Sequence, residues 1–320
     1  MTTDRIDRTA IPGVRGSVAN EISPLLPRIL QPFISTSHPA SLLLFDRDLT
    51  FWRASWQKRP FLILESAGYF FLPAPPPWSL PGAGHPEPGS LGFPDFWSRL
   101  AQTLLEWNNG IPASLDSLPP GLSAEGFQSP QTTETEYIFL RSSWETLHGR
   151  EFRAHRWERN RLRREHPALR AIPWSGEYLR PAKKLIERFI AFRRSKNDGH
   201  YSRLLLEDQY RAHEKALELS GEIGLTGLLL LSGTDLLGIG WFALIPEEAS
   251  AICFLEARQP EMDGIPVSLT QAFFRLFPRY GHLNIQGGSG ILEIDQAKKL
   301  DSPQACSQIN SQSLSSATSF

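Results

Sequence analysis

Two apolar segments in the second half of the chain, 225–231 and 236–245, constrain the fold more than any other feature. They lack the polar alternation of a strand that faces solvent, so we expect both to be buried strands. The residues between them, 232–235, include Gly233 and are typical of a hairpin turn. With a further strand expected at 250–256, the pattern predicts an antiparallel sheet at the centre of this half.

Helical patterns flank these strands. Helices are expected before them at 152–164, 181–194 and 206–220, and after them at 266–277, where Pro266 suits a first helical turn. A short strand at 283–285 then leads into a glycine-rich turn. Helices around strands of both directions predict an α/β fold of the α+β type with a mixed sheet.

Hydrophobic periodicity is weaker in the first half of the chain. We expect an amphipathic segment at 41–56, a strand at 61–72 and a helix at 96–107, whose apolar residues recur at helical spacing. The proline- and glycine-rich stretch 74–94 is expected to be a long loop. A strand at 137–140 opens the second half.

These patterns predict two lobes with polar ends. The expected organisation is a flexible N-terminus at 1–20, a first lobe at 21–136, a second lobe at 137–303 and a disordered Ser/Gln-rich tail at 304–320.

Composition excludes several classes of protein. No apolar run approaches the roughly 20 residues that span a bilayer, and the N-terminus lacks the apolar core of a secretory signal. We therefore expect a cytoplasmic protein, with peripheral membrane contact left open. The two cysteines, Cys253 and Cys306, and the scattered histidines have no metal-binding spacing, so no metal site is expected.

A basic segment is the strongest charge feature of a chain whose net charge is −1. Between 141 and 170, nine arginines face four glutamates. On a helix, Arg156, Asn160 and Arg163 lie near one another, and arginine forks bind phosphate, so this face is a candidate site for an anionic group. A solvated, salt-bridged helix is the alternative.

Two segments resemble a known family. Trp144, Gly149, Arg156 and Asn160-Arg161 in the basic segment, and Asn284, Ala297-Lys298 and Pro303 near the end, match motifs of the C-terminal domain of phosphatidylglycerol lysyltransferases. The resemblance covers about 137–303.

This resemblance implies two lobes of the acyl-CoA N-acyltransferase (GNAT) type in tandem, with the active groove in the second. It also implies an activated acyl donor, which is aminoacyl-tRNA in the lipid-modifying members. Gly287, Gly288 and Asp295 stand where many members carry acidic residues and an arginine, and no segment of this sequence is expected to correspond to the membrane-spanning half of the lipid enzymes. A different acceptor is therefore plausible.

Three residues are the candidate catalytic group. Lys298 is expected to neutralise a phosphate or stabilise an oxyanion. Asn284 is expected to orient the acyl carbonyl, or else to cap the turn at Gly287 and Gly288, which are candidate binding residues. Glu256 is a general base if burial raises its pKa.

Two further candidate contacts follow from position. Arg258 is expected to face the same groove as Glu256, or to form an ion pair with a neighbour. Gly264 and Ser268 lie where a helix begins, and free N–H groups there attract phosphate, as in coenzyme A; an ordinary helix start is equally consistent.

The leading hypothesis is an acyl- or aminoacyltransferase that moves its group directly to an amine or hydroxyl acceptor. We expect no permanently bound cofactor, and either aminoacyl-tRNA or acyl-CoA as donor. One alternative is a catalytically silent tandem lobe that binds a ligand or partner. The other is an RNA-binding module built on the basic helix and Trp157. The sequence does not indicate an oligomeric state.

Overall fold

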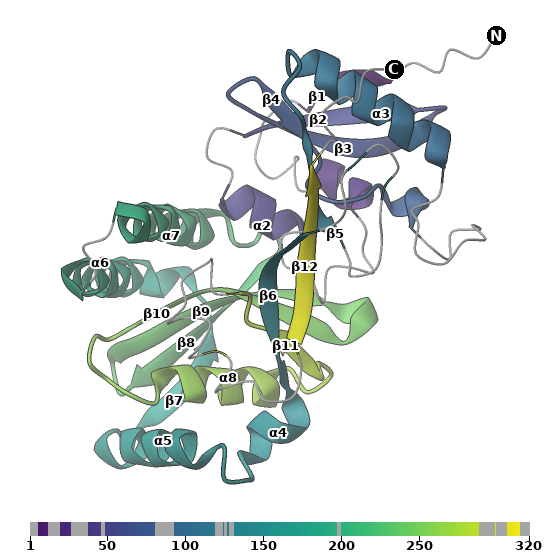
Figure 1. Cartoon of the computed structure of the whole chain (residues 1–320). Helices are drawn as coiled ribbons and strands as arrows, with labels where there is room; N and C mark the ends of the chain where they lie inside the picture. The colour runs from purple at the N-terminus through teal and green to yellow at the C-terminus, as the bar shows by residue number, and fades with distance from the viewer. Residues whose placement is uncertain are drawn as a thin grey trace. The chain divides into compact units, whose positions relative to one another are not determined.

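The computed structural model shows two compact units, which we call unit 1 (Met1–Glu136 with Ser307–Phe320) and unit 2 (Tyr137–Cys306). The residues that the structure describes are 6–11, 20–26, 38–45, 49–80, 93–118, 124, 127, 131–196, 200–287, 298 and 306–313. Sheets and helices occur in both units (Figure 1), which confirms the expected mixed α/β class.

Unit 1 is built on an antiparallel sheet in the order β1-β2-β3-β4. Its strands are β1 (Asp7–Ala10), β2 (Leu49–Trp56), β3 (Arg59–Ser66) and β4 (Tyr69–Phe71). The sequence 61–72 is two strands rather than one, because Ala67 and Gly68 both take positive φ and turn the chain. The helix α3 (Pro94–Trp107) buries Phe96, Leu100 and Leu104 completely, as its periodicity predicts.

Smaller elements complete unit 1. They are η1 (Ser23–Leu25), α2 (Pro39–Leu44), η4 (Pro77–Ser79), β5 (Ser114–Leu118) and β12 (Cys306–Ser313). Both chain ends expected to be flexible contain a strand: β1 pairs with β2, and β12 pairs antiparallel with β5. Backbone pairing needs no apolar alternation, so a polar strand of this kind gives no hydrophobic signal in the sequence. Residues 81–92 of the expected long loop lie outside the described part of the chain.

Unit 2 contains the strands and helices that the second half of the sequence predicts. In chain order they are the end of β6 (Gln131–Leu140), α4 (Arg141–Thr146), α5 (Arg153–Glu165), β7 (Leu169–Pro173), η5 (Gly176–Tyr178), α6 (Leu179–Lys196), α7 (His200–Leu219), β8 (Leu225–Ser232), β9 (Asp235–Ile245), η6 (Pro246–Glu248), β10 (Ser250–Arg258), α8 (Ile265–Leu276) and β11 (His282–Asn284). The predicted hairpin is confirmed, with Ser232 opposite Asp235 at its turn. The short elements α4 and β7 were not predicted.

The sheet of unit 2 is mixed. Within this unit its strands follow the order β6-β11-β10-β9-β8-β7, and of these neighbours only β10 and β11 are parallel. The connection between these two contains α8, since parallel neighbours need a crossover. Figure 1 shows α8 and α5 on one side of the sheet and α6 and α7 on the other. Layers on both sides explain why the strands β8 and β9 are apolar almost throughout.

Candidate functional site

The parallel pair β10 and β11 separates after three residues. Pairing begins at Ser250 with His282 and ends at Ile252 with Asn284, whereas β10 continues to Arg258. A β-bulge between Cys253 and Leu255 follows directly. Beyond Ile252, the two strands no longer pair. Bulges at such places redirect side chains and are common beside active sites. We call this region, with Cys253, Glu256, Arg258, Asn284 and Lys298, the β10–β11 junction.

Glu256 has the most unusual environment in the junction. Its Oε1 atom is buried and has no hydrogen-bond partner among the residues that the structure describes. Burial raises the pKa of this carboxyl to about 7, and the nearby Arg258 guanidinium opposes the shift. A carboxyl with this pKa exchanges its proton near neutral pH, which is the property that a general base needs.

Cys253 and Lys298 lie in the same electrostatic environment as Glu256. Burial raises the pKa of the Cys253 thiol; the Glu256 carboxylate raises it further, and the Lys298 ammonium lowers it. A carboxyl, an ammonium and a thiol therefore lie within electrostatic range of one another where β10 leaves β11. The sequence gives no reason to single out Cys253, because nothing in it reveals the bulge.

Asn284 and Lys298 support the turn that follows β11. Asn284 is completely buried, and its Oδ1 accepts a hydrogen bond of 2.7 Å from the Gln286 backbone N–H. The Lys298 Nζ donates to the carbonyl oxygens of Ile285, Gln286 and Gly287 at 2.7, 3.2 and 2.5 Å. Both side chains thus fix the backbone of the junction. Their contact with a ligand stays a prediction, and Gly288 lies outside the described residues.

Arg258 ends β10 beside other charged and titratable groups. Its Nη1 donates to the Met262 carbonyl at 2.9 Å. Burial lowers the pKa of Arg193, on α6, and Arg258 lowers it further. On α7, burial lowers the pKa of His213 to about 3. His213 is therefore neutral at physiological pH.

The start of α8 is closely packed. Gly264 has φ +81°, and a Cβ there would lie 2.6 Å from the Glu158 carbonyl oxygen of α5. The side chain of Asp263 lies 3.6 Å from Arg161, and Pro266 removes one N–H from the first turn. The Ser268 hydroxyl is buried. These features leave little room for the phosphate predicted at Gly264 and Ser268.

The predicted basic face of α5 divides into two parts. Arg156 turns inward and donates through Nη1 to the carbonyl oxygens of Leu147 and Gly149, the latter at 2.7 Å. Asn160 and Arg163 are exposed, and Asn160 accepts hydrogen bonds from Arg159. An open pocket of about 430 Å³ lies at the amino end of this helix, lined by Thr146, Leu147, His148, Gly149, Arg150 and Arg156.

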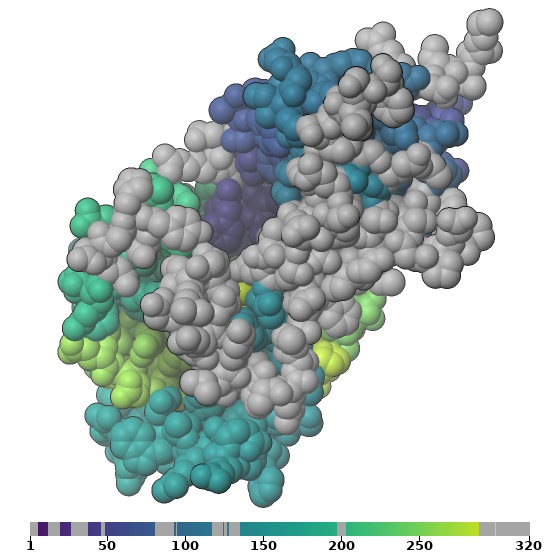
Figure 2. Space-filling view, in the orientation of Figure 1, coloured from purple at the N-terminus to yellow at the C-terminus, as the bar shows by residue number. Residues whose placement is uncertain are grey.

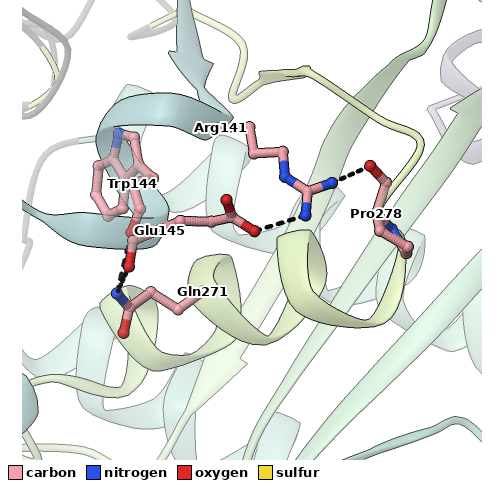
Figure 3. Close-up of polar contacts among 5 residues, drawn as sticks. All are labelled: Arg141, Trp144, Glu145, Gln271 and Pro278. Carbon is pink, nitrogen blue, oxygen red and sulfur yellow. Dashed lines mark hydrogen bonds and ion pairs between the residues drawn. The ribbon is translucent and has the colours of Figure 1, made fainter.

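The tryptophan that precedes the basic helix has a packing role. Trp144 stacks on Phe139 with ring centroids 4.0 Å apart. Figure 3 shows how its helix α4 is tied to α8: Gln271 Nε2 donates to the carbonyls of Trp144 and Glu145 at 3.0 and 3.2 Å, while Arg141 bridges Glu145 and the Pro278 carbonyl. These contacts hold α4 against α8.

The described residues contain neither a metal-binding cluster nor a membrane-spanning helix. No group of three or more His, Cys, Asp or Glu side chains among them could hold a metal ion. None of the helices in the described ranges has the length and apolar character needed to cross a bilayer.

Comparison with known proteins identifies similar folds. No model of a known family matches the sequence, and no curated protein matches it. Among solved structures, a conserved protein of unknown function from Bacteroides thetaiotaomicron is 18% identical, with a TM-score of 0.73 over 97% of this chain and 100% of its own.

Two further neighbours are structurally more distant. The C-terminal domain of a putative lysylphosphatidylglycerol synthetase from Agrobacterium fabrum is 8% identical, with a TM-score of 0.49 over 93% of this chain and 91% of its own. A tandem GNAT protein from the clavulanic acid biosynthesis pathway is 10% identical, with a TM-score of 0.41 over 99% and 100%. The chain thus shares its fold with the B. thetaiotaomicron protein, and its structure neighbours include the synthetase domain that its sequence resembles.

Proposed function

We propose that this protein is an acyltransferase that uses aminoacyl-tRNA as donor and an amine as acceptor, with the β10–β11 junction as its active site. The observation that carries the proposal is Glu256. A buried carboxyl with a pKa of about 7 stands beside the bulge of β10. Positioned groups of this pKa serve well as general bases.

The proposed reaction is a direct transfer. The acceptor amine attacks the ester carbonyl of the donor, its proton passes to the Glu256 carboxylate, and a C–N bond forms. The C–O bond to the tRNA then breaks, and the leaving oxygen takes the proton back from Glu256. Asn284 and Lys298 are positioning residues, because they hold the adjoining turn.

The start of α8 favours aminoacyl-tRNA over acyl-CoA as the donor. A coenzyme pyrophosphate at a helix start needs free N–H groups and no nearby negative charge. At α8, Asp263 lies close by, Pro266 lacks an N–H, and Gly264 packs against α5. The donor would therefore bind through contacts elsewhere on unit 2.

The test measures donor binding and transfer separately. We expect aminoacyl-tRNA to raise the melting temperature of the purified protein, since a ligand of the folded state stabilises it, and acetyl-CoA to leave it unchanged. Labelled aminoacyl-tRNA should then lose its label to an acceptor in a panel of peptides, aminosugars and aminophospholipids. A shift with acetyl-CoA alone would overturn the choice of donor. Binding of charged tRNA without any transfer would favour the silent tandem lobe.

A further inference from the structure

We infer that the outer face of α5 is a binding surface for single-stranded RNA, with Trp157 stacking on a base and arginines on both sides contacting phosphates. This inference rests on the proposed function in that the strand would belong to the tRNA donor. The binding itself can be measured without any transfer.

Trp157 is the first feature of this surface. It is 56% exposed, and on α5 it is the only large apolar side chain of this kind among the described residues. The Arg161 guanidinium lies 5.5 Å from the centroid of its ring. Arg161 is itself held by Glu165 at 2.9 Å and lies 3.6 Å from Asp263. The indole is therefore supported by a fixed neighbour while much of it stays open to a ligand.

Charge along the same face is the second feature. α5 carries six arginines and two glutamates. Arg153, Trp157, Asn160 and Arg164 follow one another at spacings of four, three and four residues, and all are exposed. They therefore share one face of the helix. Arg153 and Arg164 are about 16 Å apart along the axis, a length that spans a few stacked nucleotides. The teal surface of this part of the chain is in open view at the bottom of Figure 2.

The chemistry of this face selects its partner. Membrane-surface helices bury a broad apolar stripe, whereas the outer face of α5 offers one indole among arginines. A double-stranded nucleic acid keeps its bases stacked inside, so Trp157 would find no base to contact. A single strand offers both an open base and free phosphates, and aromatic rings with basic neighbours are the usual platform for it.

The test uses an uncharged single-stranded RNA of about twelve nucleotides, labelled for fluorescence anisotropy. Trp157→Ala should weaken binding about tenfold, and Trp157→Phe should retain most of it. Replacing Arg153 and Arg164 by Gln should weaken binding and lower the slope of log affinity against log salt by about 1.4, or about 0.7 for each phosphate that is no longer neutralised. The matched control replaces Arg180 and Arg188, exposed on α6, and should change affinity less than about twofold.

Three results would overturn the inference. They are unchanged affinity in Trp157→Ala, equal binding of a duplex of the same sequence, and binding of phosphatidylglycerol vesicles without binding of the RNA. The exposed side chains involved should not affect folding, which melting curves would verify. Because no acyl group takes part, RNA binding without acyl transfer would contradict the proposed function and leave this inference standing.

Discussion

At the scale of single residues, the side chains of the β10–β11 junction differ in how far their hydrogen-bonding groups are satisfied. Among the described residues, the buried Glu256 Oε1 has no hydrogen-bond partner, whereas the Lys298 ammonium and the Asn284 amide oxygen form hydrogen bonds with backbone groups of one turn. A general base needs a lone pair that is open to the substrate proton, whereas a side chain that holds the backbone in place needs its hydrogen bonds formed. This contrast separates the candidate base from its supports, although the sequence placed all three in one catalytic group.

The raised pKa of Glu256 makes stability depend on pH. Burial raises this pKa from 4.5 to about 7, so the folded protein keeps a proton that the unfolded chain loses between these values. The free energy of unfolding therefore falls as pH rises through that window and stays lowered above it. Glu256→Gln cannot ionise and should be more stable than the wild type at about pH 8, by about 1–3 kcal/mol.

Urea denaturation across the pH range measures this difference. The advantage of Glu256→Gln should shrink towards about pH 4, where the wild-type carboxyl is protonated in both states. An advantage that stayed the same at every pH would show that the carboxyl is not buried in its ionised form.

Arg156 should matter more for stability than its exposed neighbours. Its guanidinium donates to the carbonyls of Leu147 and Gly149, and hydrogen bonds from charged groups are among the stronger ones. Arg156→Ala should lower the free energy of unfolding by about 2 kcal/mol, and Arg163→Ala, on the exposed face of the same helix, by less than about 0.5 kcal/mol. If urea denaturation gave equal losses for the two variants, the segment from Leu147 to Gly149 would not depend on Arg156.

At the scale of elements, hydrophobic periodicity predicts the helices and strands that bury an apolar face. The helices α3, α5, α6 and α8 and the hairpin of β8 and β9 follow from it. The strands β1 and β12 do not, because backbone pairing holds them. The bulge in β10 is also not predictable from the sequence, since residues at a bulge resemble those of any buried strand. The sequence therefore leads to Glu256 and Lys298 but not to Cys253 beside them.

Packing between α5 and α8 gives a prediction at this scale. A Cβ at Gly264 would lie 2.6 Å from the Glu158 carbonyl oxygen, whereas one at Gly224, whose φ is also positive, would meet nothing within 4 Å. Gly224→Ala should cost about 1–2 kcal/mol from backbone strain alone. Gly264→Ala should cost at least about twice as much, because α5 must move. Similar destabilisation of the two variants in thermal denaturation would refute this packing.

At the scale of the whole molecule, the sequence predicts a mixed sheet in the second half and two lobes, and the structure contains two units, each with its own strands and helices. Unit 2 holds the β10–β11 junction and the basic helix α5, so both halves of the proposed donor, the acyl group and the RNA, find their candidate residues in it. Fold similarity extends over 97% of the chain to the B. thetaiotaomicron protein, yet similarity of fold does not name a substrate.

The most direct test of the proposed activity is the pH dependence of acyl transfer from labelled aminoacyl-tRNA by the wild type and by Glu256→Gln. The wild-type rate should rise as the pH passes about 7, where the carboxyl loses its proton, and then level off. Glu256→Gln should bind charged tRNA normally but transfer at least about a hundredfold more slowly, without that rise. A variant that keeps the wild-type rate and pH profile would show that Glu256 is not the base and that the β10–β11 junction is not the active site.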